Sequence, residues 1–200
     1  MTTAANAAIV LAAGASVRMG RPKQLLEFAG RPLVVRTVEA CLAADLRPVI
    51  VVLGAQRDQI QPALAHLPVI IAVNADWAEG MASSLRAGLS ELGKFSPTIP
   101  AALIALCDQP AFSAELALRL QAAAATSLRG IVAARYAGRC GAPALFRRRY
   151  FADLAALQGD QGARVLLQQQ AADVEPVDLP ALAADLDTPG DWDHFRAGQS

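Results

Sequence analysis

The sequence predicts an α/β protein of three layers, in which helices cover both faces of a doubly wound, mostly parallel, Rossmann-like sheet. Short apolar runs rich in Val and Ile alternate with longer segments of helical periodicity. The runs are almost continuously hydrophobic, which is typical of strands that are covered on both faces. The 200 residues are 54% hydrophobic and 18% charged, so the chain can bury a large core.

Five apolar runs are expected to form strands, and the alternation implies right-handed βαβ units. The runs are residues 7–12, 48–53, 68–73, 101–106 and 130–134.

Helical patterns fit between these strands. After Pro32, a favourable first-turn residue, residues 34–42 carry apolar side chains at helical spacing. Residues 81–92 repeat that spacing, and Ser113 is expected to cap the next helix.

The rhythm changes after Ala134. Residues 135–146 read as a turn and a strand that can run antiparallel, followed by helices at about 147–157 and 161–170 and a last strand at 173–179. No low-complexity linker divides the chain, so we expect a single domain over residues 1–200.

Composition excludes several classes of function. Positive and negative charges balance at 18 each, so no global basic field attracts nucleic acid. Cys41, Cys107 and Cys140 are widely spaced, which argues against a disulfide framework or a structural zinc site. No apolar run reaches the roughly 18 residues of a membrane span. The apolar stretch near the N-terminus lacks the preceding basic residues of a signal peptide, so we expect a cytoplasmic protein.

The loop after the first strand is expected to bind phosphates. Its sequence is LAAGASVRMGRPK, residues 11–23, and it leaves the strand at the carboxyl edge, where open α/β sheets bind ligands. Gly14 permits close approach of a ligand, Arg18 offers a fork of donors, and Lys23 supplies a mobile charge. The alternative is a mobile surface loop with solvated cations.

Two common phosphate-binding motifs do not fit this loop. Five residues separate Gly14 from Gly20 and Arg21 follows, so it is not a Walker A loop. Residue 16 is Ser, so it is not a G-x-G-x-x-G dinucleotide fingerprint either.

Two carboxylates are candidate metal ligands. Asp108 directly follows the strand at 101–106, and a carboxylate there can hold Mg²⁺ against phosphates, although a turn-forming role is the alternative. Thr188 and Asp191 form a capping box, which places Asp187 just ahead of a helix. Asp187 can close the metal site or merely complement the helix dipole, and Asp185 ranks below it.

Several blocks resemble one family. LAAGASVRMGRPK resembles the signature L-A-[AG]-G-x-S-x-R-M-G-x-x-K of nucleotidyltransferases with the MobA-type, GT-A-like fold. The blocks NADWAEGMASSLRAGL, LCDQP, CGAPALF, GDQGAR and DLDTPGDW follow in the family's order, so the match covers nearly the whole chain. Within the family, the chain looks most like the molybdenum cofactor cytidylyltransferases.

The resemblance implies transfer of CMP from CTP to the terminal phosphate of molybdopterin or the molybdenum cofactor, with release of pyrophosphate. It implies a nucleotide-binding half at about 1–110 and an acceptor-binding half at about 111–200. Mg²⁺ or Mn²⁺ would be held by Asp108 and Asp187. The partners would be the nucleoside triphosphate, the pterin phosphate and, transiently, a molybdenum hydroxylase or its chaperone, with no nucleic acid and no membrane.

The resemblance also implies roles for particular residues. Lys23 would act at the α-phosphate and Arg18 at the β- and γ-phosphates, with Asp108 as the third catalytic residue. No general base is needed, because a phosphate monoester is largely dianionic near neutral pH. The implied nucleotide-binding residues are Leu11, Ala12, Ala13, Gly14, Ser16, Arg18, Lys23, Gly80, Ser83 and Ser84.

Further points concern the base and the acceptor. Ala12-Ala13-Gly14 favours CTP over GTP in this family. The alternative for Ser83 and Ser84 is a role as helix caps only. The implied acceptor-binding residues are Gly141, Ala142, Pro143 and Arg164, and Ala142 departs from the Gly or His that relatives often carry. Asp160 is interpreted as a surface or capping group. The alternatives are GTP or another small phosphate acceptor on the same fold, and a non-catalytic carrier of the pterin cofactor.

Overall fold

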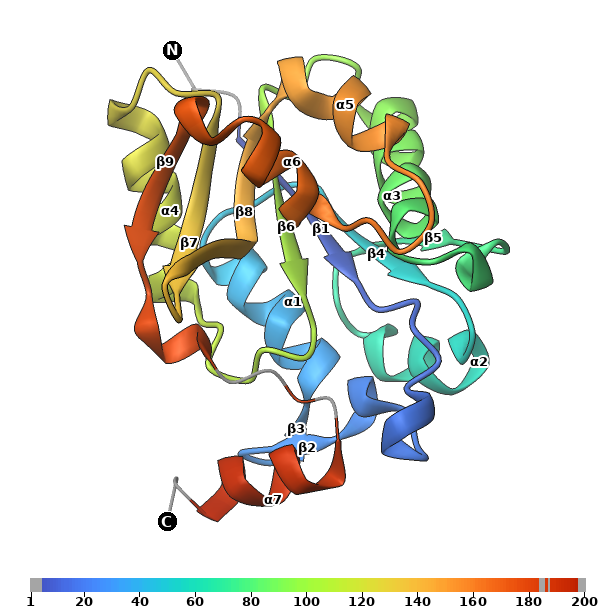
Figure 1. Cartoon of the computed structure of the whole chain (residues 1–200). Helices are drawn as coiled ribbons and strands as arrows, with labels where there is room; N and C mark the ends of the chain where they lie inside the picture. Colours follow the sequence, from blue (N-terminus) through green and yellow to red (C-terminus); the bar gives the residue numbers. More distant parts are fainter. Residues whose placement is uncertain (1–4, 184–185, 187, 198–200) are drawn as a thin grey trace.

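A seven-stranded sheet runs through the molecule in the order β5-β4-β1-β6-β8-β7-β9 (Figure 1). This computed structural model describes residues 5–183, 186 and 188–197. The strands of the sheet are β1 (Ala7–Leu11), β4 (Val49–Leu53), β5 (Ile70–Val73), β6 (Ala101–Leu106), β7 (Ile131–Tyr136), β8 (Arg139–Arg147) and β9 (Val174–Asp178). β8 runs antiparallel to β6 and β7, whereas the other neighbours pair in parallel. The predicted mostly parallel sheet is confirmed.

Helices cover both faces of this sheet, which gives the predicted three layers (Figure 1). The helices are α1 (Leu33–Ala43), α2 (Arg57–Ile60), α3 (Met81–Phe95), α4 (Ala114–Thr126), α5 (Phe151–Ala156), α6 (Ala163–Gln169) and α7 (Pro189–Ala197). One core cluster joins the sheet to α1, α2 and α4, and a second joins its other face to α3, α5 and α6. Ser113 caps α4 by accepting a hydrogen bond from the backbone N–H of Leu116, as predicted. In the described part of the chain, no helix has the length and apolar character needed to cross a membrane.

The predicted start of α1 is wrong, and the element before this helix was not predicted. Pro32 is not the first helical residue, because it pairs with Glu27 in a short hairpin of β2 (Glu27–Phe28) and β3 (Arg31–Pro32). Its ψ of 143° keeps it extended, so the helix begins at Leu33. The helix expected at about 147–157 is likewise interrupted, since Arg148–Tyr150 form a 3₁₀ turn ahead of α5.

Helix α7 packs against the β2–β3 hairpin, although the two are far apart in the sequence. Trp192 of α7 is buried in a third apolar cluster with Met19, Leu26, Leu33 and Leu186. Phe195 contacts Phe28 edge to face at 4.8 Å between ring centroids. α7 begins with the predicted capping box, in which the Asp191 carboxylate accepts from the backbone N–H of Thr188 at 2.7 Å. The cluster therefore ties the end of the described chain to the first loop.

A polar cluster fixes the start of β7 to the turn before β9. The carboxylate of Asp173 accepts hydrogen bonds from the Tyr150 hydroxyl at 2.5 Å, the Arg149 guanidinium at 2.6 Å and the backbone N–H of Gly130 at 3.0 Å. These donors, Tyr150 first and Arg149 next, lower the pKa of Asp173 to about 2.

Asp173→Asn is expected to lower the free energy of unfolding at pH 7 by about 1 kcal/mol, because the donors lose a charged acceptor that is partly screened by solvent. A carboxyl whose pKa is depressed on folding stabilises the fold above its unfolded pKa. The difference should therefore shrink as the pH falls from 4 towards 2. Urea unfolding at several pH values measures it, with Asp153→Asn on exposed α5 as the control. A difference that is constant with pH would contradict the assignment.

Candidate active site

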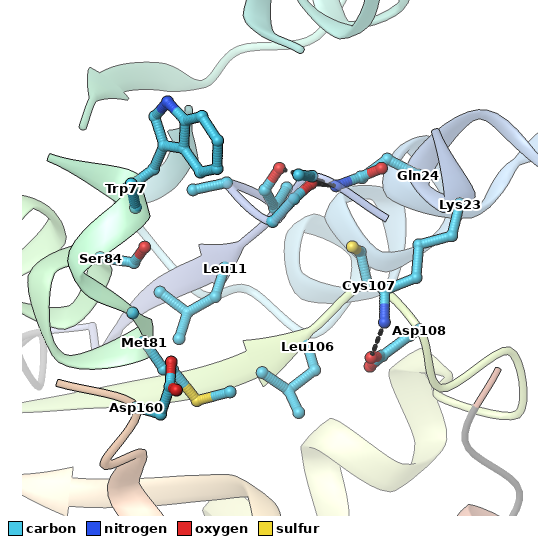
Figure 2. A pocket seen from close by; sticks show the side chains of 16 residues that line it. Leu11, Lys23, Gln24, Trp77, Met81, Ser84, Leu106, Cys107, Asp108 and Asp160 are labelled. Atoms are coloured by element: carbon cyan, nitrogen blue, oxygen red, sulfur yellow. Dashed lines mark hydrogen bonds and ion pairs between the residues drawn. The ribbon is translucent and has the colours of Figure 1, made fainter. Parts of the chain in front are cut away.

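A cavity of about 410 Å³ opens at the carboxyl ends of β1 and β6, beside the start of α3 (Figure 2). Such an edge is where parallel strands present their following loops to ligands. The cavity is lined by Leu11, Ala12, Ala13, Gly14, Ala15, Lys23, Gln24, Trp77, Ala78, Gly80, Met81, Ser84, Leu106, Cys107, Asp108 and Asp160. Segments that are far apart in sequence thus share one wall.

The charged centre of the cavity is an ion pair between Lys23 and Asp108. The Lys23 ammonium lies 2.6 Å from Oδ2 of Asp108, and each side chain is 17% exposed (Figure 2). Lys23 comes from the first loop and Asp108 from the turn after β6, so the pair joins two neighbouring strand ends. The ion pair holds the two side chains together at the wall of the cavity.

Gln24 holds the first loop in shape. Its side chain is 1% exposed, and its amide donates to the carbonyls of Ala12 at 3.0 Å and Gly14 at 2.9 Å. The Ser16 hydroxyl donates to Oε1 of Gln24 at 3.2 Å and accepts from the backbone N–H of Lys23 at 3.1 Å. The loop is therefore folded by its own polar groups before any ligand binds.

The start of α3 is held by Asn74, which is buried after β5. Its amide donates to the hydroxyls of Ser83 at 2.8 Å and Ser84 at 3.0 Å. Ser83 donates in turn to the carbonyl of Gly80 at 2.8 Å and does not line the cavity, whereas Ser84 does. Ser83 therefore anchors the helix start, and Ser84 is the serine placed beside a ligand.

A tight backbone approach closes the cavity opposite the ion pair. Gly80 has a φ of +113°, and a Cβ there would lie 2.4 Å from Oδ1 of Asp160 and 2.6 Å from the Gly159 carbonyl. The backbone N–H of Ala82 donates to that Gly159 carbonyl at 3.1 Å. Only glycine fits this contact, which brings the carboxylate of Asp160 to the start of α3.

Asp108 offers an oxygen suited to a cation. Its Oδ1 is buried and has no hydrogen-bond partner among the described residues, while Oδ2 faces Lys23. The described residues contain no cluster of three or more His, Cys, Asp or Glu that could hold a metal ion. Mg²⁺ commonly needs only one or two carboxylates, because phosphates and water supply the remaining ligands. The donor set therefore fits a hard divalent cation that is shared with a polyphosphate.

Cys107 is not a nucleophile. The thiol is buried beside Asp108, and burial first and the neighbouring carboxylate next raise its pKa to about 12. It therefore stays protonated near neutral pH.

The second expected metal ligand, Asp187, lies outside the described residues, as does Asp185. The residue between them is described: Leu186 is 1% exposed and its backbone N–H donates to the carbonyl of Asp108 at 3.0 Å. The described backbone of this late segment thus contacts Asp108 directly.

The remaining expected site residues are not all in the cavity. Ser16 supports the loop from behind, and Arg18 is exposed in the 3₁₀ turn Val17–Met19. Neither is among the described residues that line the cavity. Leu11, Ala12, Ala13, Gly14, Lys23, Gly80, Ser84 and Asp108 do line it.

The expected acceptor residues fall in two places. Gly141, Ala142 and Pro143 lie in β8, where the Ala142 carbonyl accepts from the Gln109 amide at 3.0 Å and the Tyr136 hydroxyl at 2.8 Å. They adjoin the turn that carries Asp108, although they are not among the described residues that line the cavity around Lys23 and Asp108. Arg164 lies in α6 and lines a separate cavity.

Three residues of the cavity were missed or misread from the sequence. The sequence predicts no role for Gln24, and Asp160 is interpreted from it as a surface or capping group. Trp77 lines the cavity with its indole 38% exposed, and it carries no spacing signal.

These features define a class of protein. A doubly wound sheet with a cavity at its carboxyl edge, a pre-folded small-residue loop and a Lys–Asp pair is the arrangement of a nucleotide-binding α/β transferase. The chain belongs to the MobA-like NTP transferase family, whose model matches residues 8–174. The family resemblance noted from the motifs is confirmed.

Known proteins of similar length resemble the chain. It is 33% identical over 192 residues to nicotine blue oxidoreductase of Paenarthrobacter nicotinovorans, with 90% of this chain and 91% of that protein covered. It is 28% identical over 203 residues to the purine catabolism protein PucB of Bacillus subtilis, with 96% of each covered. The structure of Rv0371c from Mycobacterium tuberculosis in complex with manganese superimposes with a TM-score of 0.79 at 27% identity, covering 96% of this chain and 97% of that one.

Gln24→Ala is expected to weaken nucleotide binding, because the carbonyls of Ala12 and Gly14 lose their donor and the loop is no longer pre-folded. Loss of a buried hydrogen-bond partner costs about 1–3 kcal/mol, so the Kd of the nucleotide should rise about 10-fold or more. Calorimetric titration with non-transferable analogues of the four nucleoside triphosphates measures the change. Gln59→Ala, exposed on α2, is the control. An unchanged Kd would show that the loop does not hold the nucleotide.

Proposed function

We propose that this protein is a nucleotidyltransferase that transfers CMP from CTP to the terminal phosphate of molybdopterin or the molybdenum cofactor and releases pyrophosphate. The observation that carries the proposal is the Lys23–Asp108 pair in a cavity walled by the Ala12-Ala13-Gly14 loop. Membership of the MobA-like family supports nucleotidyl transfer. The choice of CTP and of the pterin acceptor is supported by the motif resemblance.

Different residues of the cavity would contact the phosphate end and the nucleoside end of the nucleotide. Lys23 would neutralise charge on the α-phosphate, while the backbone of residues 12–15 approaches the phosphates closely. Ser84, Gly80 and Trp77 would enclose the nucleoside end, where an indole face can stack on a base. In this proposal residues 1–110 supply the nucleotide-binding half and residues 111–200 the acceptor-binding half.

A divalent metal fits the proposed site. Asp108 and Asp187 would hold Mg²⁺ or Mn²⁺, which when bound would neutralise phosphate oxygens. Support comes from the unpartnered Oδ1 of Asp108 and from the manganese complex of the structural relative. Lys23 would keep the Asp108 carboxylate oriented, and Arg18 would approach the β- and γ-phosphates from the rim of the loop.

The chemistry needs little from the protein beyond charge and alignment. The acceptor phosphate is already nucleophilic near neutral pH, so no side chain must remove a proton. The attacking oxygen displaces pyrophosphate from the α-phosphorus in line, and Lys23 would stabilise the charge that develops there. This account agrees with the high pKa of Cys107, whose thiol plays no part.

A second candidate function is oxidoreduction, with nicotine blue as the substrate to be tested. The observation that favours it is the 33% identity, over about nine-tenths of both chains, to nicotine blue oxidoreductase. Against it stands the first loop, which does not fit the dinucleotide fingerprint that positions a nicotinamide cofactor. Oxidation of NADH or NADPH with nicotine blue, followed by absorbance, would support this candidate.

One assay tests the proposed transferase against its alternatives, which are another nucleotide, another acceptor or a non-catalytic carrier. Pyrophosphate release is followed with each of the four nucleoside triphosphates, a pterin–molybdate acceptor and Mg²⁺. We expect release with CTP and little with GTP. Release with GTP alone or with a different phosphate acceptor would change the assigned substrates, but the protein would still be a nucleotidyltransferase. Tight pterin binding with no release from any nucleotide would indicate a carrier.

Lys23→Ala is expected to lower kcat about 10²–10³-fold, because it removes one preorganised charge from the transition state. Asp108→Asn should cause a comparable loss by weakening the metal site and releasing Lys23 from its partner. Initial rates of pyrophosphate release measure both variants, and circular dichroism checks their folding. Lys94→Ala, exposed at the end of α3, is the matched control. Full activity of Lys23→Ala would refute the catalytic assignment.

A further inference from the structure

A second cavity, of about 390 Å³, lies between α6 and the β7–β8–β9 end of the sheet. We call it the arginine cavity, because four of its ten lining residues are arginines. It is lined by Arg129, Arg135, Arg139, Cys140, Arg164, Leu167, Gln168, Ala171, Val174 and Pro176.

Two of the four arginines are already paired with acids. Arg135 makes two hydrogen bonds to Asp178, at 2.6 Å and 2.7 Å. Arg129 lies 3.6 Å from Glu175 and donates to the carbonyl of Val174. These pairs stabilise the position of β9 beside β7 and leave little charge for a ligand.

The other two arginines have no such partner. Arg139 and Arg164 form no ion pair or hydrogen bond through their side chains within the described structure. Four guanidinium groups therefore face two carboxylates, Asp178 and Glu175, and the cavity carries an excess of two positive charges. Its walls include Leu167, Val174 and Pro176, and apolar walls strengthen the attraction of an anion.

Guanidinium groups select the chemistry of the ligand. Each presents a planar fork of donors that matches the oxygens of a phosphate or carboxylate. An excess of two charges fits a dianionic group or two single anions. The cavity is large enough for the anion together with part of the organic body that carries it.

A short segment of the chain links the arginine cavity to the cavity around Lys23 and Asp108, here called the catalytic cavity. Arg164 follows Asp160, which lines the catalytic cavity, by four residues, and four residues span at most about 14 Å. Asp160 is also the one described residue beyond position 110 in the lining of the catalytic cavity. A single ligand that extends about 14 Å beyond Asp160 can therefore contact Arg164.

We infer that the arginine cavity binds an anionic group of the acceptor other than the phosphate that attacks the nucleotide. Arg139 and Arg164 are the binding residues. The inference rests on the proposed function in assigning the ligand to the acceptor, and it specifies an elongated acceptor with a second anionic end. The anion site itself does not depend on nucleotidyl transfer.

The first arm of the test measures binding without catalysis. The full chain, free of metal and nucleotide, is titrated calorimetrically with inorganic phosphate. Replacing both Arg139 and Arg164 with Gln should weaken binding at least 10-fold, because two charged donors are lost. The matched control Arg148→Gln, whose exposed side chain makes one long hydrogen bond, to Ile99, should retain the wild-type affinity. Thermal unfolding confirms that each variant is folded.

Another result of this arm overturns the site. If the double variant binds phosphate as Arg148→Gln does, the arginine cavity does not hold an anion.

The second arm measures turnover with CTP and the pterin–molybdate acceptor. The double variant should raise the KM of the acceptor about 10-fold and leave the KM of CTP within 2-fold. An unchanged acceptor KM overturns the assignment to the acceptor. If the wild-type protein shows no turnover, the proposed function fails, and the phosphate titration still decides whether the anion site exists.

Discussion

The contact between Lys23 and Asp108 is the constraint on which the rest of the site depends. It requires that the first loop return to the sheet and that β6 end beside β1. Gln24 and Ser16 meet the first requirement through hydrogen bonds inside the loop. The parallel register of β1 and β6 meets the second. An ammonium and a carboxylate at 2.6 Å thus mark where a polyphosphate and its counter-ion would meet.

The cavity around this pair is built by backbone approach as much as by side chains. Gly80 lets the 159–160 turn lie against the start of α3, and small residues at 12–15 line the opposite wall. Alanine and glycine leave the space that a nucleotide needs, and the core behind them is dense and apolar. At this cavity Asp160 lies against Gly80, which precedes it by eighty positions.

Sequence reasoning predicted the parts of this protein that follow periodic patterns. Continuous apolar runs located the buried strands, and the capping residues Ser113 and Thr188 located helix starts, because these signals are local. The hairpin before α1 escaped because two-residue strands have no period to detect. Gln24 escaped because its role comes from burial against carbonyls twelve residues away. Motifs predicted Asp108 and Lys23 as site residues. Their contact depends on the tertiary structure, which the spacing of residues in the sequence does not reveal.

The packing of α7 on the β2–β3 hairpin has a consequence for how the protein can be dissected. The family match ends at residue 174, yet Trp192 and Phe195 cover Leu26 and Phe28 from beyond that limit. A shortened chain that stops before α7 would present these aromatic and aliphatic groups to water on the loop that carries Lys23. Such a fragment would keep its main sheet strands but would tend to self-associate. A fusion partner or affinity tag attached after α7 therefore needs a spacer, so that the helix stays packed against the β2–β3 hairpin.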